Sequence, residues 1–241
     1  MSELAELPET GTGERGVDLG RRLVAEALGT GLLIVAVIGS GIMASRLSPG
    51  DVGLQLLENA AATAAALIGL ILIFGSISGG HFNPVVTLVD RADGTIGSRD
   101  TGLYIGAQIV GGCLGAVLAN LMFDLPAVEW STTTRSSGSL WLSEVVATVG
   151  LLLVIHGCVR TGRAGVVPFA VGLWIGGAYF FTSSTSFANP AVTIARTLSD
   201  TFAGIAPASA PMFIVMQLLG GVLAYVLIRF LYPRPDPHAG G

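Results

Sequence analysis

The chain has 241 residues, of which 51% are hydrophobic and 12% are charged, whereas a soluble domain carries roughly twice that share of charge. With a mean hydropathy of +0.73, an ordinary soluble protein is excluded. The basic residues, all arginine, number 12 against 16 acidic ones, so we expect no nucleic-acid partner. The two cysteines and three histidines lack the spacing of a disulfide framework or a metal site, and we expect no metal and no cofactor.

Long stretches with few charges follow one another along the chain. A helix needs about 20 apolar residues to cross the hydrocarbon core of a bilayer. Six stretches reach this length with at most one charged residue each, so the sequence predicts a multi-pass protein of a lipid bilayer. The expected spans lie near residues 23–44, 57–76, 102–123, 141–159, 165–181 and 211–232.

Two of the uncharged stretches are too long for one crossing, because each would measure about 45 Å as a single helix. The stretch after Glu58 is interrupted at Asn83-Pro84, and the stretch after Arg163 at Asn189-Pro190. Asparagine suits a helix cap and proline suits the first turn. We therefore expect a span, a polar loop and a short re-entrant half-helix in each. Irregular backbone at membrane depth occurs where it is buried in protein or lines a watery cavity, so the pattern indicates a pore or a binding cavity.

The two halves of the chain follow one plan. Residues 83–88 (Asn-Pro-Val-Val-Thr-Leu) and 189–194 (Asn-Pro-Ala-Val-Thr-Ile) are identical at four of six positions. Three spans per half is an odd number, so the second half must be inserted upside down relative to the first. The pseudo-twofold axis of such a repeat would bring Asn83 and Asn189 together near the membrane midplane.

Six crossings place both chain ends on one side of the membrane. Nine arginines would lie on that side, which the positive-inside rule assigns to the cytoplasm, and three would lie opposite: Arg46, Arg135 and Arg196. We therefore expect an integral protein of the inner (plasma) membrane with both termini cytoplasmic.

One channel domain is expected over residues 21–232, with one repeat at about 21–123 and the other at about 141–232. Residues 1–20 carry acidic residues before any arginine, which is unlike a secretory signal, and are expected to form a disordered cytoplasmic tail. Residues 233–241 are expected to form a Pro-rich tail.

The half-helices predict the chemistry of the midplane. Each helix amino end carries roughly half a positive charge, and the amides of Asn83 and Asn189 add donors. A cation would be repelled there, whereas the oxygen of a neutral solute or of water would accept hydrogen bonds. The sequence thus predicts a passive channel for small neutral solutes that excludes ions, with Pro84, Val85, Pro190 and Ala191 completing the midplane.

Glu26 and Glu144 occupy matching positions inside predicted spans, and an intramembrane carboxylate is a functional candidate by default. We prefer the interpretation that each accepts backbone N–H groups from a re-entrant loop, with a proton relay as the alternative. His81 is either a packed loop residue or a group whose protonation gates the pore. His156 is interpreted as a core residue.

These motifs resemble those of the aquaporin and aquaglyceroporin family (major intrinsic proteins), whose hallmark is two Asn-Pro-Ala boxes. The resemblance covers all six spans, and the first box departs from it at Val85. It implies an all-α membrane protein, with six helices and two half-helices in an inverted 3+3 repeat, that assembles as a homotetramer. Gln108 and Gln217, which begin matching Gln-x-x-Gly-Gly segments, are assigned with Glu26, Glu144 and His81 to loop support. The motifs are Ala25-Glu26-x-x-Gly29-Thr30, Ser78-Gly79-Gly80-His81-Phe82-Asn83-Pro84, Ala107-Gln108-x-x-Gly111-Gly112 and Asn189-Pro190-Ala191.

The resemblance also implies a selectivity filter, at Thr63, Gly177, Ser186 and Val192 by ungapped counting from the two boxes. Family members usually carry arginine at the last of these positions. All four residues here are uncharged and small or medium in size, so we expect a wide constriction, with Arg196 one helical turn beyond as a partial substitute. A bacterial subgroup with the same replacement is associated with arsenic resistance. Expected solutes are water, glycerol-like polyols, urea and metalloid hydroxides such as arsenite or methylated arsenicals.

Three alternatives remain. The protein would be a water-selective aquaporin if the outer constriction were narrower than the small filter side chains predict. A secondary transporter is more distant, since inverted repeats also build carriers but both boxes here offer only asparagine. An intramembrane serine hydrolase using Ser78 with a histidine would leave the repeat unexplained. We expect no enzymatic activity.

Overall fold

Six long apolar helices dominate the computed structural model, which describes residues 17–233. Each is long and apolar enough to cross a membrane, which confirms the six predicted spans. Of the two expected tails, residues 1–20 and 233–241, the parts at 1–16 and 234–241 lie outside the described residues. The long helices are α1 (Leu19–Leu47), α2 (Val52–Ser78), α4 (Ser98–Met122), α5 (Gly138–Arg160), α6 (Val167–Phe181, preceded by the 3₁₀ turn η1 at Ala164–Val166) and α8 (Ala210–Leu231).

Four of the long helices, α1, α2, α4 and α5, begin earlier than the charge pattern predicts, and in α1 and α2 a carboxylate caps the extended end. The side chain of Asp18 accepts a hydrogen bond from the backbone N–H of Arg21, and α1 starts at Leu19, inside the expected tail. The side chain of Asp51 accepts from Leu54 in the same way and starts α2 at Val52. A carboxylate at the cap satisfies a free N–H of the first turn, which lets a helix extend beyond its apolar stretch.

The two half-helices form where the Asn-Pro pairs predict them. They are α3 (Pro84–Ala92) and α7 (Pro190–Ala195), and the second continues as the 3₁₀ turn η2 (Arg196–Leu198). Asn83 and Asn189 are their caps, with proline in the first turn of both. The cap residues have extended backbone, as the residue before a proline prefers.

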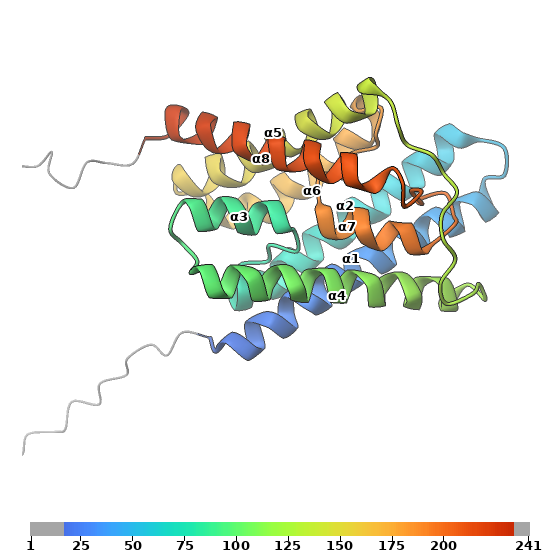
Figure 1. The fold of residues 1–241 in the computed structure, drawn as a ribbon, viewed down its shortest axis with the longest axis horizontal. Helices are drawn as coiled ribbons and strands as arrows, with labels where there is room; N and C mark the ends of the chain where they lie inside the picture. The colour runs from blue at the N-terminus through green and yellow to red at the C-terminus, as the bar shows by residue number, and fades with distance from the viewer. Residues whose placement is uncertain (1–16, 234–241) are drawn as a thin grey trace, which may run out of the picture.

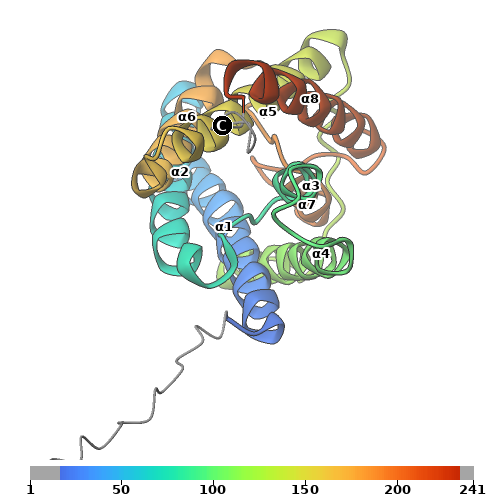
Figure 2. The same cartoon turned by 90° about the vertical axis from the view of Figure 1, so that its left-hand side faces the viewer.

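The helices form a ring in which α3 and α7 lie end to end (Figures 1 and 2). In the first half α1 packs on α2 and α4, in the second α5 packs on α6 and α8, and α2 packs on α6 between the halves. The start of α1 and the end of α8 lie at the same end of the molecule, which we call the termini side; the opposite end is the loop side (Figure 1). Six crossings in alternating directions explain this arrangement.

Two glycines let α4 approach α1 closely. A Cβ atom at Gly111 would overlap the backbone of Ala27, and one at Gly115 would overlap the backbone of Gly31. The Gly-x-x-x-Gly segment is therefore a helix contact, as such spacing commonly is in membranes.

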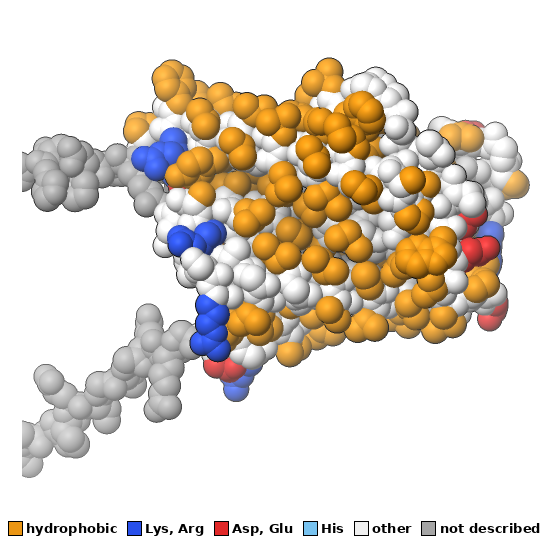
Figure 3. Space-filling view, viewed as in Figure 1, with side chains coloured by type: hydrophobic (Ala, Val, Ile, Leu, Met, Phe, Trp, Pro, Cys, Tyr) orange, Lys and Arg blue, Asp and Glu red, His pale blue; other side chains and the backbone are white. Residues whose placement is uncertain are grey.

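The outer surface has the polarity of a membrane protein. Hydrophobic side chains cover the middle of the face in Figure 3, whereas arginine and acidic side chains gather at its two ends. Large apolar residues such as Leu173 and Phe230 are strongly exposed on this outside. A bilayer would cover them.

Candidate functional site

A cavity of about 680 Å³ extends along the inside of the ring. Asp90 and Arg160 line its termini side, Asn83 and Asn189 its middle, and Arg196 its loop side. Between them the wall is largely aliphatic, with side chains such as Leu67 and Ile175. A few polar groups spaced along an apolar wall are typical of a path for small molecules.

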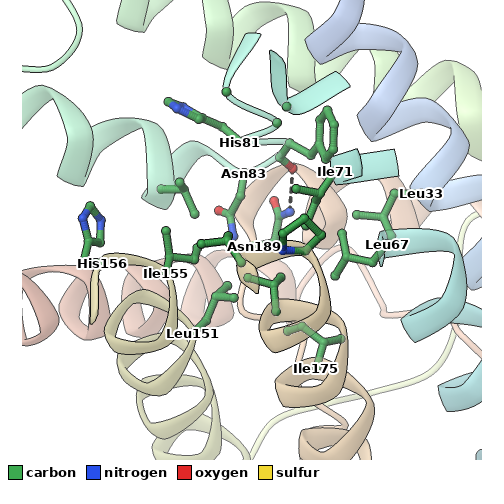
Figure 4. A pocket seen from close by; sticks show the side chains of 18 of the residues that line it. Leu33, Leu67, Ile71, His81, Asn83, Leu151, Ile155, His156, Ile175 and Asn189 are labelled. Carbon is green, nitrogen blue, oxygen red and sulfur yellow. Dashed lines mark hydrogen bonds between the residues drawn. The ribbon is translucent and has the colours of Figure 1, made fainter. Parts of the chain in front are cut away.

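The two asparagines of the Asn-Pro pairs face each other in the middle of the cavity (Figure 4). Asn83 donates from Nδ2 to the backbone oxygen of Ala188, and Asn189 donates from Nδ2 to that of Phe82; both distances are 2.8 Å. Each side-chain oxygen accepts from the backbone of its own half-helix. Since an amide nitrogen has two donors, each asparagine keeps one N–H for a molecule in the cavity.

Glu26 is fully buried and holds the first re-entrant loop. Its carboxylate accepts hydrogen bonds from Ser78 Oγ (2.6 Å), from the backbone N–H groups of His81 (3.0 Å) and Phe82 (2.8 Å), and from Gln108 Nε2 (2.8 Å). A carboxylate with several charge-assisted hydrogen bonds is well stabilised when buried. The loop is thereby fixed although Phe82 has a positive φ of 48°.

Glu144 repeats this arrangement in the second half. Its carboxylate accepts from Ser184 Oγ (2.6 Å), from the backbone N–H groups of Phe187 (3.0 Å) and Ala188 (2.9 Å), and from Gln217 Nε2 (2.6 Å). Neither Glu26 nor Glu144 lines the cavity. This geometry favours the loop-support interpretation over the proton relay.

Three of the four expected filter residues line the cavity: Thr63, Ser186 and Val192. Gly177 does not, and it lies exposed on the outer side of α6. Tyr179 lines the cavity instead and donates from its hydroxyl to Thr63 Oγ1 at 3.2 Å. The ungapped count is therefore two residues off, and two residues turn a helical side chain by about 200° to the opposite side.

Arg196 lies at the loop-side end of the cavity, 2% exposed. Its guanidinium carbon is 3.4 Å from the centroid of the Phe187 ring, and its Nε donates to the backbone oxygen of Ala203. Arg135 approaches the same ring at 5.3 Å and donates from Nε to the oxygen of Gly204 at 2.9 Å. Sequence reasoning placed Arg196 near this mouth but missed Arg135, which comes from the α4–α5 connection.

Ionisable side chains gather at the termini-side end of the cavity. His81 Nε2 lies 2.9 Å from one carboxylate oxygen of Asp90, and His156 Nε2 lies 3.7 Å from the other. Arg160 forms an ion pair with Asp93. The interpretation of His156 as a core residue is therefore incomplete, because it also lines the cavity. The sequence does contain a signal for this cluster. Thr87 and Asp90 are three residues apart, which places them on one face of α3, and that face lies toward His81.

The fold and the cavity define a membrane channel built from an inverted repeat. The family model described as major intrinsic protein matches residues 14–186 and 164–240. A protein named aquaglyceroporin AqpS, from Rhizobium meliloti (strain 1021), is 50% identical over 220 residues, which cover 91% of this chain and 94% of that protein. An aquaporin Z from Rhodopseudomonas palustris is 32% identical over 230 residues, which cover 89% and 94%.

A solved structure has the same fold. The X-ray structure of the aquaglyceroporin from Plasmodium falciparum matches with a TM-score of 0.71 and 21% identity, covering 90% of this chain and 98% of that one. The chain therefore belongs to the major intrinsic protein family. It is a membrane channel for small neutral solutes and not an enzyme.

Proposed function

We propose that this channel passes uncharged solutes larger than water: glycerol-like polyols, urea and undissociated metalloid hydroxides such as arsenite or its methylated forms. The observation that carries the proposal is the residue three positions after Asn189. This residue is Val192, and it lines the cavity together with Thr63 and Ser186. None of the three carries a charge, and none is large; Tyr179, the fourth wall residue at this level, adds a bulky but uncharged ring. The 50% identity to a protein named aquaglyceroporin supports the same solute class.

The filter of this proposal consists of Thr63, Tyr179, Ser186 and Val192. The Tyr179 hydroxyl donates a hydrogen bond to Thr63. This bond holds the ring against the cavity wall, so the ring does not swing across the solute path. The hydroxyl groups here and the N–H groups of Asn83 and Asn189 offer hydrogen bonds to a polyol at two levels of the cavity. The aliphatic wall between them suits the carbon backbone of such a solute.

The test compares osmotic and solute fluxes of proteoliposomes by stopped-flow light scattering, with water, glycerol and neutral arsenous acid. Wild type should pass all three. Val192→Arg should block glycerol and arsenous acid while water flux survives, because a long side chain then crosses the path. Val192→Leu is the matched control, which adds volume without charge or reach and should keep most glycerol flux. Wild-type flux of water alone would contradict the proposal and favour a water-selective aquaporin.

The same proposal includes the setting of the channel: the inner membrane, with both termini in the cytoplasm. Among the described residues seven arginines lie toward the termini side, against Arg46, Arg135 and Arg196 on the loop side, which supports this orientation by the positive-inside rule. A reporter that is active only in the cytoplasm should be active when fused to the C-terminus, and a reporter that is active only outside the cytoplasm should be inactive there.

We also propose a homotetramer with one cavity in each subunit, as membership of the family implies. The apolar outer faces of the long helices are compatible with contacts either to lipid or to other subunits. Native mass spectrometry after gentle detergent release should give four chains per particle. A monomer that retains glycerol flux would contradict the tetramer and leave the channel proposal intact.

A further inference from the structure

Arg196 lines the loop-side mouth of the cavity, and Arg135 lies over the same Phe187 ring without lining the cavity. The described part of the chain places no carboxylate within ion-pair distance of either arginine. By contrast, Arg22 and Arg160 each pair with an aspartate. The Nε groups of the two arginines are bonded to consecutive backbone oxygens, those of Ala203 and Gly204. Their terminal Nη nitrogens make no hydrogen bond within residues 17–233. Both guanidinium groups are thus held by Nε, and their terminal N–H donors are unused within the described residues.

The local carboxylates are committed elsewhere. Glu144 receives its hydrogen bonds from the loop and from Gln217, and Asp200 receives bonds from Thr132 on the surface. Burying a charge without a partner costs free energy. In agreement, burial lowers the pKa of the Arg135 guanidinium from its ordinary value, an effect that the Glu144 carboxylate only partly offsets.

A third group points to a ligand at this place. Ser186 is 3% exposed and lines the cavity, yet its hydroxyl has no hydrogen-bond partner among the described residues. It directly precedes Phe187, the ring on which both guanidinium groups lie. Ser186 and Arg196 line the same cavity. An unused buried hydroxyl and an unused guanidinium fork on one cavity wall suit the acceptor oxygens of a small oxyanion, since guanidinium binds carboxylates in a planar, bidentate manner.

We propose that Arg196 and Ser186 form a binding site for a small monovalent carboxylate at the loop-side mouth, with Arg135 supplying the second positive charge. The aliphatic wall beyond the site offers no replacement for the hydration of an ion, so a bound carboxylate stays at the mouth and does not pass. It occupies the entrance that neutral solutes use. Carboxylate and neutral solute therefore compete, and this second step rests on the proposed solute path.

The test uses acetate as the probe and acetamide, its uncharged isostere, as the control ligand. Binding is measured on the detergent-solubilised full chain by saturation-transfer NMR of the methyl signal, at constant ionic strength with chloride as the replacement anion. Glycerol flux into proteoliposomes is measured in the same salts applied on the outside. Wild type should bind acetate and not acetamide, and external acetate should slow glycerol entry.

Three variants examine the site. Ser186→Ala removes only the hydroxyl and should weaken acetate binding roughly tenfold. Arg135→Gln removes one charge, and Arg196→Lys replaces the planar fork with a single ammonium group; both should weaken binding by at least about tenfold. Arg46→Gln is the matched control, because Arg46 also lies on the loop side over a phenylalanine ring but is exposed and outside the cavity. It should bind acetate as wild type does.

Failure of the site and failure of the proposed function give different results. If wild type passes glycerol but shows no acetate signal, or if all variants bind acetate equally, the carboxylate site is wrong and the channel proposal stands. If acetate binds with the expected variant dependence but glycerol flux is absent, the site stands and the solute proposal fails. Unfolded Arg196→Lys protein would leave Ser186→Ala and Arg135→Gln to decide.

Discussion

Asn83 donates its side-chain N–H to the backbone oxygen of Ala188 at 2.8 Å, and this bond joins the first half of the chain to the second at the middle of the cavity. Its counterpart from Asn189 to Phe82 has the same length. Each asparagine therefore caps its own half-helix and holds the loop that leads to the other. The two halves position each other, so neither asparagine is a replaceable cap.

Replacing Asn83 with aspartate should separate these two roles. Aspartate is a good helix cap, but its carboxylate has no N–H for the oxygen of Ala188 and faces that oxygen with a negative charge. We expect a loss of about 1–3 kcal/mol in stability together with loss of glycerol flux. Thermal unfolding and stopped-flow flux would measure the two effects. Ser137→Asp, at the exposed cap of α5, should change neither.

Glu144→Gln should destabilise the second re-entrant loop. The carboxylate of Glu144 accepts hydrogen bonds on both of its oxygens, from donors on Ser184, Phe187 and Ala188. Glutamine replaces one of these oxygens with an NH₂ group, which cannot accept, so at least one buried donor loses its partner. Hydrogen bonds to charged groups contribute about 1.5–3 kcal/mol each, and we expect a total loss of about 3 kcal/mol or more in thermal or denaturant unfolding. Glu129→Gln, on the exposed α4–α5 connection, serves as control. Equal stability of the two variants would refute the loop-support role.

The contact of α4 with α1 predicts opposite outcomes for two glycines of one helix. Gly111→Ala places a methyl group into the backbone of Ala27, and overpacking of this kind costs about 1–3 kcal/mol or more. Gly106→Ala meets nothing within 4 Å and should be neutral or stabilising by up to about 1 kcal/mol. Melting temperatures in the same detergent would compare them. A stable Gly111→Ala protein would show that the helices separate more easily than the packing implies.

The position of Tyr179 predicts which residue of α6 controls solute size. Tyr179→Ala removes a ring from the cavity wall and should raise the flux of solutes larger than glycerol, such as erythritol. Gly177→Leu adds a side chain on the outer face, where it should leave every flux unchanged. Light scattering with polyols of increasing length would show the difference. If Gly177→Leu altered selectivity and Tyr179→Ala did not, the filter would have to be reassigned.

Much of this architecture is specified by short segments of the sequence. Long uncharged stretches predicted the six spans, and the paired Asn-Pro segments predicted both half-helices and their caps. The odd number of spans per half predicted the inversion, which brings Asn83 and Asn189 together. These inferences succeed because a bilayer imposes one length and one polarity on every span, and because cap and proline preferences act within a few residues.

The tertiary structure decided which side chains reach the cavity. A count along the chain selected Gly177, but the rotation of α6 against its neighbours presents Tyr179. Arg135 and Arg196 come from segments far apart in the sequence and meet only because both lie over Phe187. His156 lies beside Asp90 because α5 packs near the half-helix. The sequence by itself therefore determined the spans, the half-helices and the inverted repeat, whereas the lining of the path depends on helix rotation and on long-range packing, which no local pattern specifies.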